Sequence, residues 1–320
     1  MPLEVATYIN QLDAANPTAT DPKSQGDDHL RLLKAVLQAN FPNLTGAVTP
    51  TQAQLNYLAG AIGNIQTGGD MRNLLDNATG AINQRVYGSG SATVGANQVT
   101  LDRWKVIVTG QSLIFPAATP DRVMTAPIGG VEQLIRGRRI VGGVYTLSWT
   151  GTATATVNGV AIVNGAQTAS LPANTDVTVR FFNGTFSLPQ FEAGSVVTPF
   201  QRKPPSIEAD LCFMEAAKSY SAAVALGANT QAGRYWFGTN LAGSIFGTIY
   251  FPVPMSVAPT LFALYDQNGN IGSTLSISST GAGTTRSATI SLVTEKTIEI
   301  VGAASSDIAI VGHWFAATGQ

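Results

Sequence analysis

Short apolar runs separated by Asn-Gly dipeptides constrain the middle of this chain most strongly. Three such dipeptides stand between apolar runs: Asn158-Gly159, Asn164-Gly165 and Asn183-Gly184. Asn and Gly tolerate the positive φ angles of a two-residue type I′ turn, so each dipeptide predicts a β-hairpin. Val177, Val179 and Phe181 alternate with polar neighbours, which is typical of a strand with one buried face. This pattern predicts an antiparallel β-sandwich over residues 85–200.

A second β-rich module is predicted over residues 221–320. Its strand candidates are Tyr235–Gly238, Ser244–Phe251, Pro259–Tyr265, Thr274–Ser278, Ser287–Val293, Thr297–Val301 and Asp307–Ala316. Asn268-Gly269 is predicted to close one hairpin, and Gly281–Gly283 to open another. Only 12% of the 320 residues are charged and 33 are Gly, which suits tightly turning strands packed against copies of themselves. The expected fold is mainly β, with two antiparallel, jelly-roll-like β-sandwich modules and an N-terminal helical segment.

The N-terminal residues 1–84 are predicted to be an extended arm followed by short helices. Ser24 and Asp27 have capping-box spacing, and Phe41-Pro42 should end the first helix. Thr49-Pro50 should start a second helix. Apolar residues at helical spacing are Leu30, Leu33 and Leu37, then Leu55, Leu58, Ile62 and Ile65, then Met71, Leu74, Ala78 and Ile82. Such narrow rows are typical of seams between several chains, so we expect contacts with other copies or virion proteins. The alternatives are packing on the chain's own β-modules and, for residues 1–24, a frayed tail.

A linker and helix are predicted over residues 201–220, between the two β-modules. Pro204 and Pro205 should keep the linker extended. Ser206 is the expected N-cap of an amphipathic helix that continues to Tyr220. The single cysteine, Cys212, forms no internal disulfide and is expected to be a buried, unreactive thiol.

Three blocks of the sequence resemble bacteriophage tail-fibre proteins, in the order found in that family. FEAGSVVTPF (Phe191–Phe200), followed by Ala209, Leu211 and Cys212, resembles their "LEAGSxATPFExR" and "ELxLCxRYY" segment, although Lys218-Ser219-Tyr220 replaces the basic and aromatic ending. Residues 5–60, with NPTATDPKSQGDDHLRLLK and VTPTQAQLNYLAG, resemble the N-terminal attachment module. YFPVPMSVAPTLFALYDQNGNIG and the final HWFAATGQ resemble the terminal domain. Asp102-Arg103-Trp104 also occurs in this family, in a module that resembles a carbohydrate-binding jelly roll.

The resemblance implies a non-enzymatic tail fibre on the virion exterior, made in the cytoplasm of the bacterial host. It implies a homotrimer that is attached to the phage tail through its N-terminus and binds host surface polysaccharide or lipopolysaccharide. The alternative is a purely structural virion component, such as a head fibre, collar or adaptor protein without a glycan site. A depolymerase is less favoured, because glycoside cleavage needs two carboxylates on one face of a cleft and no such pair can be identified.

Candidate glycan-binding residues are aromatic, carboxylate and amide side chains near predicted loops of the C-terminal module: Arg234, Tyr235, Trp236, Asn240, Tyr265, Asp266, Asn268 and Asn270. Aromatic faces stack on sugar C–H surfaces, and polar groups bind the hydroxyls. The alternative for the aromatic residues is a place in the core.

Other classes of function lack support in the sequence. A net charge of −1 gives no basis for nucleic-acid binding, and no apolar window of about 18 residues predicts membrane insertion. No secretory signal peptide is expected from the first residues. The chain has no P-loop, GxSxG or Cys/His cluster, so no catalytic residue, cofactor or metal is expected. His29 is expected near a helix start and His313 in a structural role in a strand.

Overall fold

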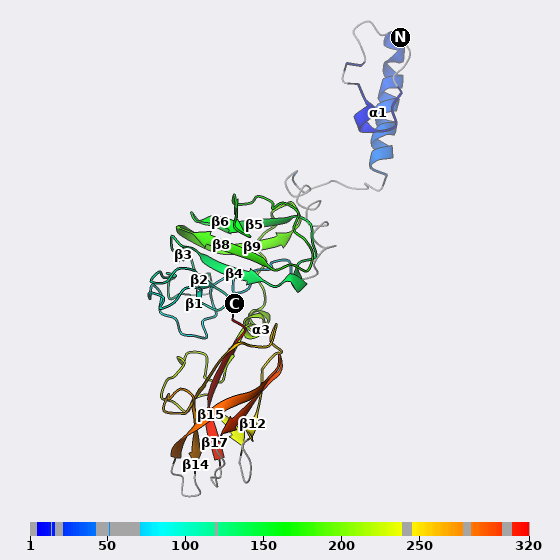
Figure 1. Ribbon diagram of the computed structural model, residues 1–320. Coiled ribbons are helices and arrows are strands. Elements are labelled where there is room, and N and C mark those ends of the chain that lie inside the picture. The colour runs from blue at the N-terminus through cyan, green and yellow to red at the C-terminus, as the bar shows by residue number, and fades with distance from the viewer. Residues whose placement is uncertain are drawn as a thin grey trace. The chain divides into compact units, whose positions relative to one another are not determined.

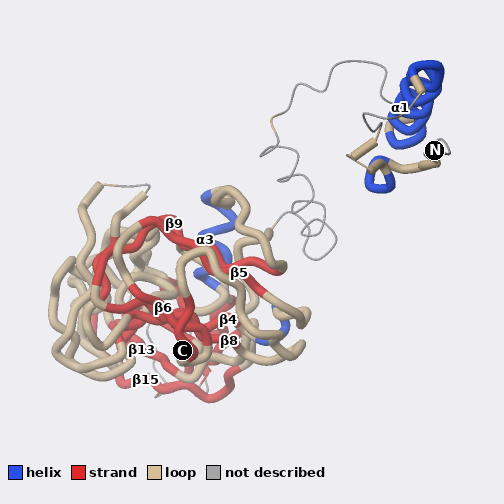
Figure 2. Tube along the Cα trace, turned by 90° about the horizontal axis from the view of Figure 1, so that it is seen from above, coloured by secondary structure: helices blue, strands red, loops and turns tan. Residues whose placement is uncertain are grey.

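The structure is a computed structural model that describes residues 5–13, 15–16, 22–42, 51, 71–118, 121–238, 245–277, 283–302 and 309–319. The chain divides into two compact units, Met1–Asn56 and Tyr57–Gln320. Strands and loops make up most of the described second unit, and every strand pairing in it is antiparallel (Figures 1 and 2). The predicted class, mainly β with an N-terminal helix, is confirmed.

The first unit contains helix α1 (Gly26–Asn40), preceded by the short 3₁₀ turns η1 (Ile9–Gln11) and η2 (Lys23–Gln25). The capping box predicted at Ser24 is wrong, because η2 includes Ser24 and the N-cap is Gln25 without a side-chain cap. Asp27 and Asp28 lie in the first turn, where the helix dipole favours negative charge. The helix ends before Phe41, as predicted. The predicted second helix and its residues Leu55, Leu58, Ile62 and Ile65 lie outside the described residues.

Residues 71–84 form no helix, although their apolar spacing predicted one. Leu75 and Ala78 are instead buried in the core of the first β-module. Polar side chains within this segment bond to its backbone; the Asn73 carboxamide oxygen, for example, accepts a hydrogen bond from Leu75 N at 3.0 Å. Such bonds compete with helix formation. The predicted N-terminal boundary at residue 84 therefore falls inside the first β-module.

The first β-module consists of two packed sheets. Its strands are β1 (Gln98–Val99), β2 (Lys105–Val106), β3 (Met124–Ala126), β4 (Val131–Ile135), β5 (Tyr145–Thr150), β6 (Thr154–Val157), β7 (Val160–Ile162), β8 (Val177–Phe182) and β9 (Gly184–Ala193). The six-stranded sheet has the order β1-β2-β4-β8-β6-β7, and the three-stranded sheet the order β3-β9-β5. The 3₁₀ turn η3 (Gly137–Arg139) follows β4. This arrangement is the β-sandwich that the alternating pattern predicted.

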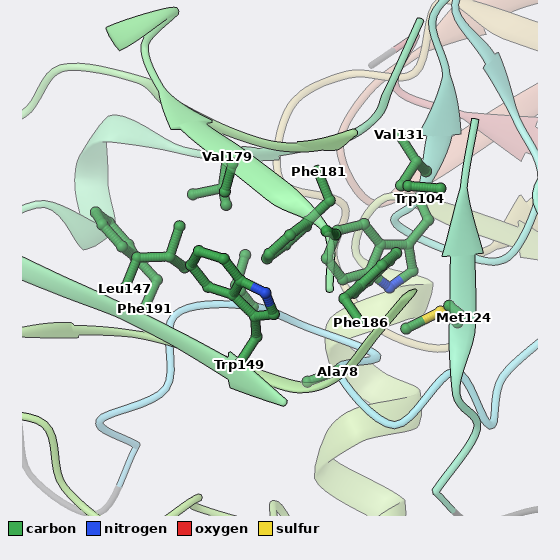
Figure 3. Packing of buried hydrophobic residues seen from close by; sticks show 14 of the residues in the cluster. Ala78, Trp104, Met124, Val131, Leu147, Trp149, Val179, Phe181, Phe186 and Phe191 are labelled. Carbon is green, nitrogen blue, oxygen red and sulfur yellow. The ribbon is translucent and has the colours of Figure 1, made fainter. Parts of the chain in front are cut away.

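Aromatic residues fill the space between the two sheets (Figure 3). Phe181 of β8 stacks on Phe186 of β9, with ring centroids 4.4 Å apart and planes 3° from parallel. Trp149 meets Phe181 edge-on at 5.4 Å, and Trp104 meets Phe186 at 5.4 Å. Aromatic contacts of this kind add to the free energy gained from apolar burial. The β8–β9 ring pair therefore joins the two sheets at the centre of the sandwich.

The Asn-Gly dipeptides have three different roles. Asn158-Gly159 is a two-residue hairpin turn between paired Val157 and Val160, and both turn residues have positive φ, as predicted. Asn164-Gly165 also forms a turn, but Gly165 alone has positive φ, so this is not the predicted type I′ turn. The Asn164 carboxamide instead accepts from Trp149 N at 3.0 Å and donates to Trp149 O at 2.7 Å.

The hairpin predicted at Asn183-Gly184 is wrong, because the dipeptide joins β8 and β9, which belong to different sheets. A side chain at Gly184 would place its Cβ 2.7 Å from the backbone nitrogen of Ala153. Glycine is thus required here because two chain segments approach closely. The Asn-Gly dipeptide alone does not show whether its glycine serves such an approach or a hairpin turn.

Helix α3 (Pro205–Phe213) joins the two β-modules. The N-cap predicted at Ser206 is wrong, because Pro205 occupies the first helical position and Pro204 precedes it as the N-cap. The helix also ends earlier than predicted, since Ala216–Lys218 form strand β10. Cys212 is buried, and burial raises the pKa of its thiol well above the ordinary value.

The C-terminal module contains every strand predicted in it, near its predicted position. These strands are β11 (Tyr235–Gly238), β12 (Ile245–Tyr250), β13 (Leu261–Tyr265), β14 (Ser273–Ile277), β15 (Gly283–Val293), β16 (Thr297–Gly302) and β17 (Ala309–Ala317). β14 and β15 pair across residues 278–282, which lie outside the described residues. At Asn268-Gly269 the flanking strands β13 and β14 do not form a regular hairpin ladder, and a single bridge joins Tyr265 to Ile271. β13 pairs with β17, and β14 pairs with β15 and β17.

Strand β17 is the common partner in this module. It pairs with β10, β11, β13 and β14, so the described strands form one continuous hydrogen-bonded network around a single core. The end of β17 lies beside α3 at the junction with the first module (Figure 1), where Thr318 N donates to Glu215 O at 3.0 Å. The last strand therefore ties the C-terminal module together and returns the chain to the junction.

Candidate functional site

The loop predicted to bind glycans is held together by one of its predicted members. Asp266 is 0% exposed and accepts hydrogen bonds from Asn268 N at 2.9 Å, Asn270 Nδ2 at 2.7 Å and Thr285 Oγ1 at 2.8 Å. Burial alone would raise the pKa of Asp266, but the bonds from Asn270, Thr285 and Asn268 outweigh it and hold the pKa below its ordinary value. Asp266 therefore organises the loop, and its carboxylate is already saturated.

The other predicted glycan-binding residues have different surroundings. Arg234 bonds the side chain of Gln267 at 3.0 Å and so lies beside the loop. Tyr265 packs against Tyr220, with ring centroids 5.9 Å apart, and Tyr235 packs against the module core. Trp236 is 60% exposed on β11. Asn240 lies outside the described residues.

His313 is buried on β17 and has a structural role, as expected. Its Nε2 lies 3.0 Å from Thr230 O, its Nδ1 lies 3.3 Å from Ser219 Oγ, and its ring stacks on Tyr220 at 3.8 Å. Burial lowers the pKa of His313, so a neutral ring is favoured. Burial also raises the pKa of Tyr220 to about 12.

The FEAGSVVTPF block has a structural explanation. Glu192 is buried at the end of β9 and accepts hydrogen bonds from Thr198 N at 2.9 Å, Thr198 Oγ1 at 2.5 Å and Gln190 Nε2 at 2.8 Å. Gly194 between them has a φ of 111°, which side chains rarely allow. This block therefore makes a carboxylate-stabilised turn and directs the chain toward the linker.

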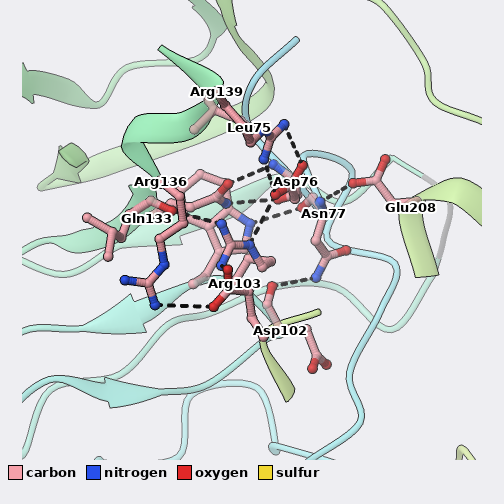
Figure 4. A network of polar contacts seen from close by, with 12 residues as sticks. Leu75, Asp76, Asn77, Asp102, Arg103, Gln133, Arg136, Arg139 and Glu208 are labelled. Atoms are coloured by element: carbon pink, nitrogen blue, oxygen red, sulfur yellow. Dashed lines mark hydrogen bonds and ion pairs between the residues drawn. The ribbon is translucent and has the colours of Figure 1, made fainter. Parts of the chain in front are cut away.

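A buried charge network occupies the junction between the first β-module and α3 (Figure 4). At its centre Asp76 accepts from Arg139 at 2.7 and 3.1 Å, from Arg103 Nε at 3.2 Å and from Lys203 Nζ at 2.8 Å. Gln133 bonds both the backbone N and O of Asp76, at 2.7 and 2.8 Å. Segments distant in sequence therefore meet on one carboxylate.

The cations around Asp76 determine its ionisation. Burial would raise the pKa of Asp76, but the positive charges of Arg139, Lys203 and Arg103 outweigh it and hold the pKa well below the ordinary value. Glu208 of α3, which bonds Asn77 N, behaves in the opposite way. Burial raises the pKa of Glu208 above its ordinary value, although Lys203 opposes the shift.

The lowered pKa predicts a pH dependence of stability. In the unfolded chain Asp76 has the ordinary pKa of 3.8, and in the folded protein its pKa is lower. The ionised carboxylate therefore stabilises the fold fully above pH 3.8, and this stabilisation is lost as the pH falls through the folded pKa. We expect the free energy of unfolding to fall with pH below about 4, and to fall less in an Asp76→Asn variant. Urea denaturation across this pH range measures both slopes. If the free energy of unfolding fell equally with pH in the parent and in Asp76→Asn, the lowered pKa of Asp76 would be contradicted.

Glu215 extends the network to the C-terminal module. Its Oε2 accepts from Thr318 Oγ1 at 2.5 Å and lies 3.4 Å from Arg136, while its Oε1 lies 3.6 Å from Arg103 Nη1. Burial would raise the pKa of Glu215, but Arg103, Thr318 and Arg136 together hold it below the ordinary value. A glycosidase acid needs a raised pKa, so Glu215 is not suited to that role.

A cavity of about 340 Å³ opens beside this network, between the two β-modules. Residues from both modules and from the end of α3 line it: Arg85, Asn97, Gln98, Val99, Asp102, Arg103, Cys212, Glu215, Ala216, Leu261, Phe315, Ala317 and Gly319. Arg85 lies over the ring of Phe315, with its guanidinium carbon 5.2 Å from the ring centroid, and 3.4 Å from Asp102. The wall thus combines two arginines, two carboxylates and an apolar side.

Asp102 and Arg103 belong to the Asp-Arg-Trp motif of the sequence, whereas their charged neighbours at the cavity do not. Arg85 and Glu215 come from distant segments and belong to no recognisable motif, and Phe315 lies in the final HWFAATGQ block without having been identified as a site residue. Within the part of the chain that the structure describes, no cluster of three or more His, Cys, Asp or Glu side chains suits a metal ion. The described helices include none with the length and apolar character needed to cross a bilayer.

Comparison of the chain with models of known protein families finds no match, and comparison with curated proteins finds none either.

Proposed function

We propose that this chain is a non-enzymatic subunit of a bacteriophage tail fibre, attached to the virion through its N-terminal unit and binding host surface polysaccharide or lipopolysaccharide through its β-modules. The proposal begins from the three sequence blocks that resemble tail fibres. The structural observation that carries it is the exposed leucine row of α1.

Leu30, Leu33 and Leu37 are 61%, 43% and 45% exposed and lie on one face of α1. Val36, which borders this row three residues after Leu33, is buried in the same helix. The helix therefore packs through one face and leaves an apolar row uncovered among the described residues. Such a row is typical of a seam between chains. The exposed leucine row fits a homotrimer in which the α1 helices of three chains meet at this row. The row or the residues next to it would also contact the phage tail.

The assembly test uses the full chain. Changing Leu30, Leu33 and Leu37 together to Gln should shift the sedimenting species from a trimer toward a monomer, because the seam loses its apolar contacts. Ala35→Gln with Ala39→Gln is the matched control, since both alanines are exposed on the opposite face of α1. A monomeric parent protein, or an unchanged assembly in the triple variant, would contradict the proposal.

A purely structural virion component is the second candidate. The burial of Asp266 favours it, because the predicted glycan-binding loop uses its carboxylate internally. Glycan binding by the full chain separates the candidates, since an adaptor or collar protein would bind none. The ion pairs of the buried Glu132, with Arg180 at 2.6 Å and Lys105 at 3.1 Å, do not favour a hydrolytic role for this carboxylate.

A further inference from the structure

The first β-module has a small slot at one open side of its sandwich. β7 is the last strand of the six-stranded sheet and pairs, among the described strands, with β6 alone. Residues 167–171 run beside the other sheet, where single bridges join Gln167 to Thr146 of β5 and Leu171 to Gly143. The slot has a volume of about 140 Å³ and is lined by Val157, Asn158, Val160, Ala161, Ile162, Gln167, Thr168, Ala169 and Leu171. It shares no lining residue with the junction cavity between the two β-modules.

The wall of the slot is apolar because the core reaches its edge here. Val157 and Val160 are cross-strand partners on one face of the β6–β7 hairpin. Val157 is buried in the core, whereas Val160, on the edge strand, is 72% exposed. Ile162, on the same face of β7, and Leu171 pack partly against the core. None of the lining residues is charged or aromatic, so the slot suits a neutral apolar group and offers no ring on which a sugar could stack.

Amide groups with free hydrogen-bonding capacity surround this apolar wall. Asn158 Oδ1 accepts from Thr178 N at 2.8 Å, but Asn158 Nδ2 donates to no described residue. The exposed carboxamide of Gln167 makes no hydrogen bond within the described part of the chain. The residues that flank a two-residue hairpin turn exchange both backbone bonds, so the N–H and C=O of Ala161, one residue further on, point to the free edge of β7. Donors and acceptors therefore lie around the mouth of an apolar slot.

An acetamido group has the same division, since its methyl group is apolar, its N–H donates and its C=O accepts. The slot has room for such a group but lies well below the roughly 300 Å³ at which sites for whole small molecules begin. We propose that the slot binds the acetamido group of an N-acetylated sugar in the host surface polysaccharide. The methyl group lies against Val160, Ile162 and Leu171, the C=O accepts from Asn158 and the N–H donates to Gln167. This site rests on the proposed glycan-binding function and names the substituent that is recognised.

The first test measures binding to the full-length protein. Methyl glycosides of N-acetylglucosamine and N-acetylgalactosamine are compared with those of glucose and galactose by saturation-transfer NMR. We expect at least one N-acetylated glycoside to bind about tenfold more tightly than its unacetylated counterpart, with the strongest saturation on the acetyl methyl protons. One buried methyl group and one hydrogen bond account for such a factor. Equal affinities within both pairs, or saturation centred on the ring protons, would overturn the site.

The second test fills the slot without removing a hydrogen bond. Ala169 lines the slot and is exposed, so Ala169→Trp should occupy it while the fold is kept. We expect the dissociation constant of the N-acetylated glycoside to rise at least about tenfold, because the methyl group loses its place. Ala92→Trp, at an exposed residue of the same module outside the slot, is the matched control and should leave binding unchanged. Thermal midpoints equal to that of the parent confirm that both variants are folded.

A third variant tests the polar rim. Gln167→Ala removes the proposed acceptor and should raise the dissociation constant about fivefold, the equivalent of one hydrogen bond. Thermal stability should stay unchanged, since this side chain bonds no other described residue.

The outcomes separate the slot from the general glycan role. If Ala169→Trp leaves glycoside binding unchanged, the slot is wrong while glycan binding by the chain stands. A changed assembly state of Ala169→Trp in sedimentation would also overturn the site, because the slot would then be a contact between chains. If host polysaccharide binds the parent but no N-acetylated glycoside does, the slot alone fails. If neither binds, the glycan role fails with it.

Discussion

Asp76→Asn is expected to lower the free energy of unfolding of the first β-module by about 3–5 kcal/mol. The carboxylate is buried with Arg103, Arg139 and Lys203 around it, and the amide cannot balance their charges. Replacing a whole buried ion pair by apolar residues changes stability little. Removing one partner is far more costly, because the remaining charge stays buried without its counter-charge. Urea denaturation monitored by tryptophan fluorescence should report the loss, since Trp104 belongs to the same module.

Asp121→Asn is the matched control for this change. Asp121 pairs with Arg202 at 2.7 Å, close to the 2.8 Å between Asp76 and Lys203, but both partners are largely exposed. Because solvent screens such a pair, we expect a loss of under about 1 kcal/mol. Similar losses in the two variants would mean that the junction network does not stabilise the module through buried charge.

Phe181→Ala is expected to cost about 3–5 kcal/mol in the same module. The ring is fully buried and contacts Phe186, Trp104 and Trp149, so its removal leaves a cavity between the two sheets. The surrounding aromatic rings are held by opposite sheets and can close such a cavity only in part. Tryptophan fluorescence should change in the folded state as well, because both indole rings lose a neighbour.

The next residue of the same strand provides the control. Phe182 lies on the opposite face of β8 and is only partly buried, with Arg180 beside its ring at 5.8 Å. Phe182→Ala should therefore lower stability by about 1 kcal/mol or less. If the two substitutions had equal effects, the assignment of β8 to a sandwich with one buried face would be wrong.

Local patterns predicted the strands well because alternation and turns are short-range properties. Every strand from β11 to β17 lies near its predicted position, and β8 has the predicted alternation. β10 was missed because its residues, Ala216–Lys218, continue the apolar helical spacing of the preceding segment, and only the fold shows that Ala216 pairs with Ala317. Residues 71–84 were mistaken for a helix because apolar spacing does not reveal that Asn73 and Asp76 bond to backbone and to distant side chains.

The candidate site was predictable only in part. The Asp-Arg-Trp motif drew attention to Asp102 and Arg103, and both line the junction cavity. Their partners there, Arg85 and Glu215, are ordinary charged residues in sequence and gain meaning only from the fold. The loop around Asp266 was predicted from residue types that bind sugars, but the same types also stabilise tight loops.

The position of β17 has a consequence for biosynthesis. Strands β10, β11, β13 and β14 leave the ribosome before their shared partner has been translated, whereas every strand of the first β-module precedes α3 and can pair at once. The growing chain should therefore carry a finished leading sandwich and a trailing segment in which β12, β14, β15 and β16 can pair but β10, β11 and β13 lack their ladder partner until β17 emerges. A nonsense codon shortly before residue 309 would remove the ladder partner of β10, β11 and β13 and one of the two partners of β14, so its effect would extend beyond the loss of one strand.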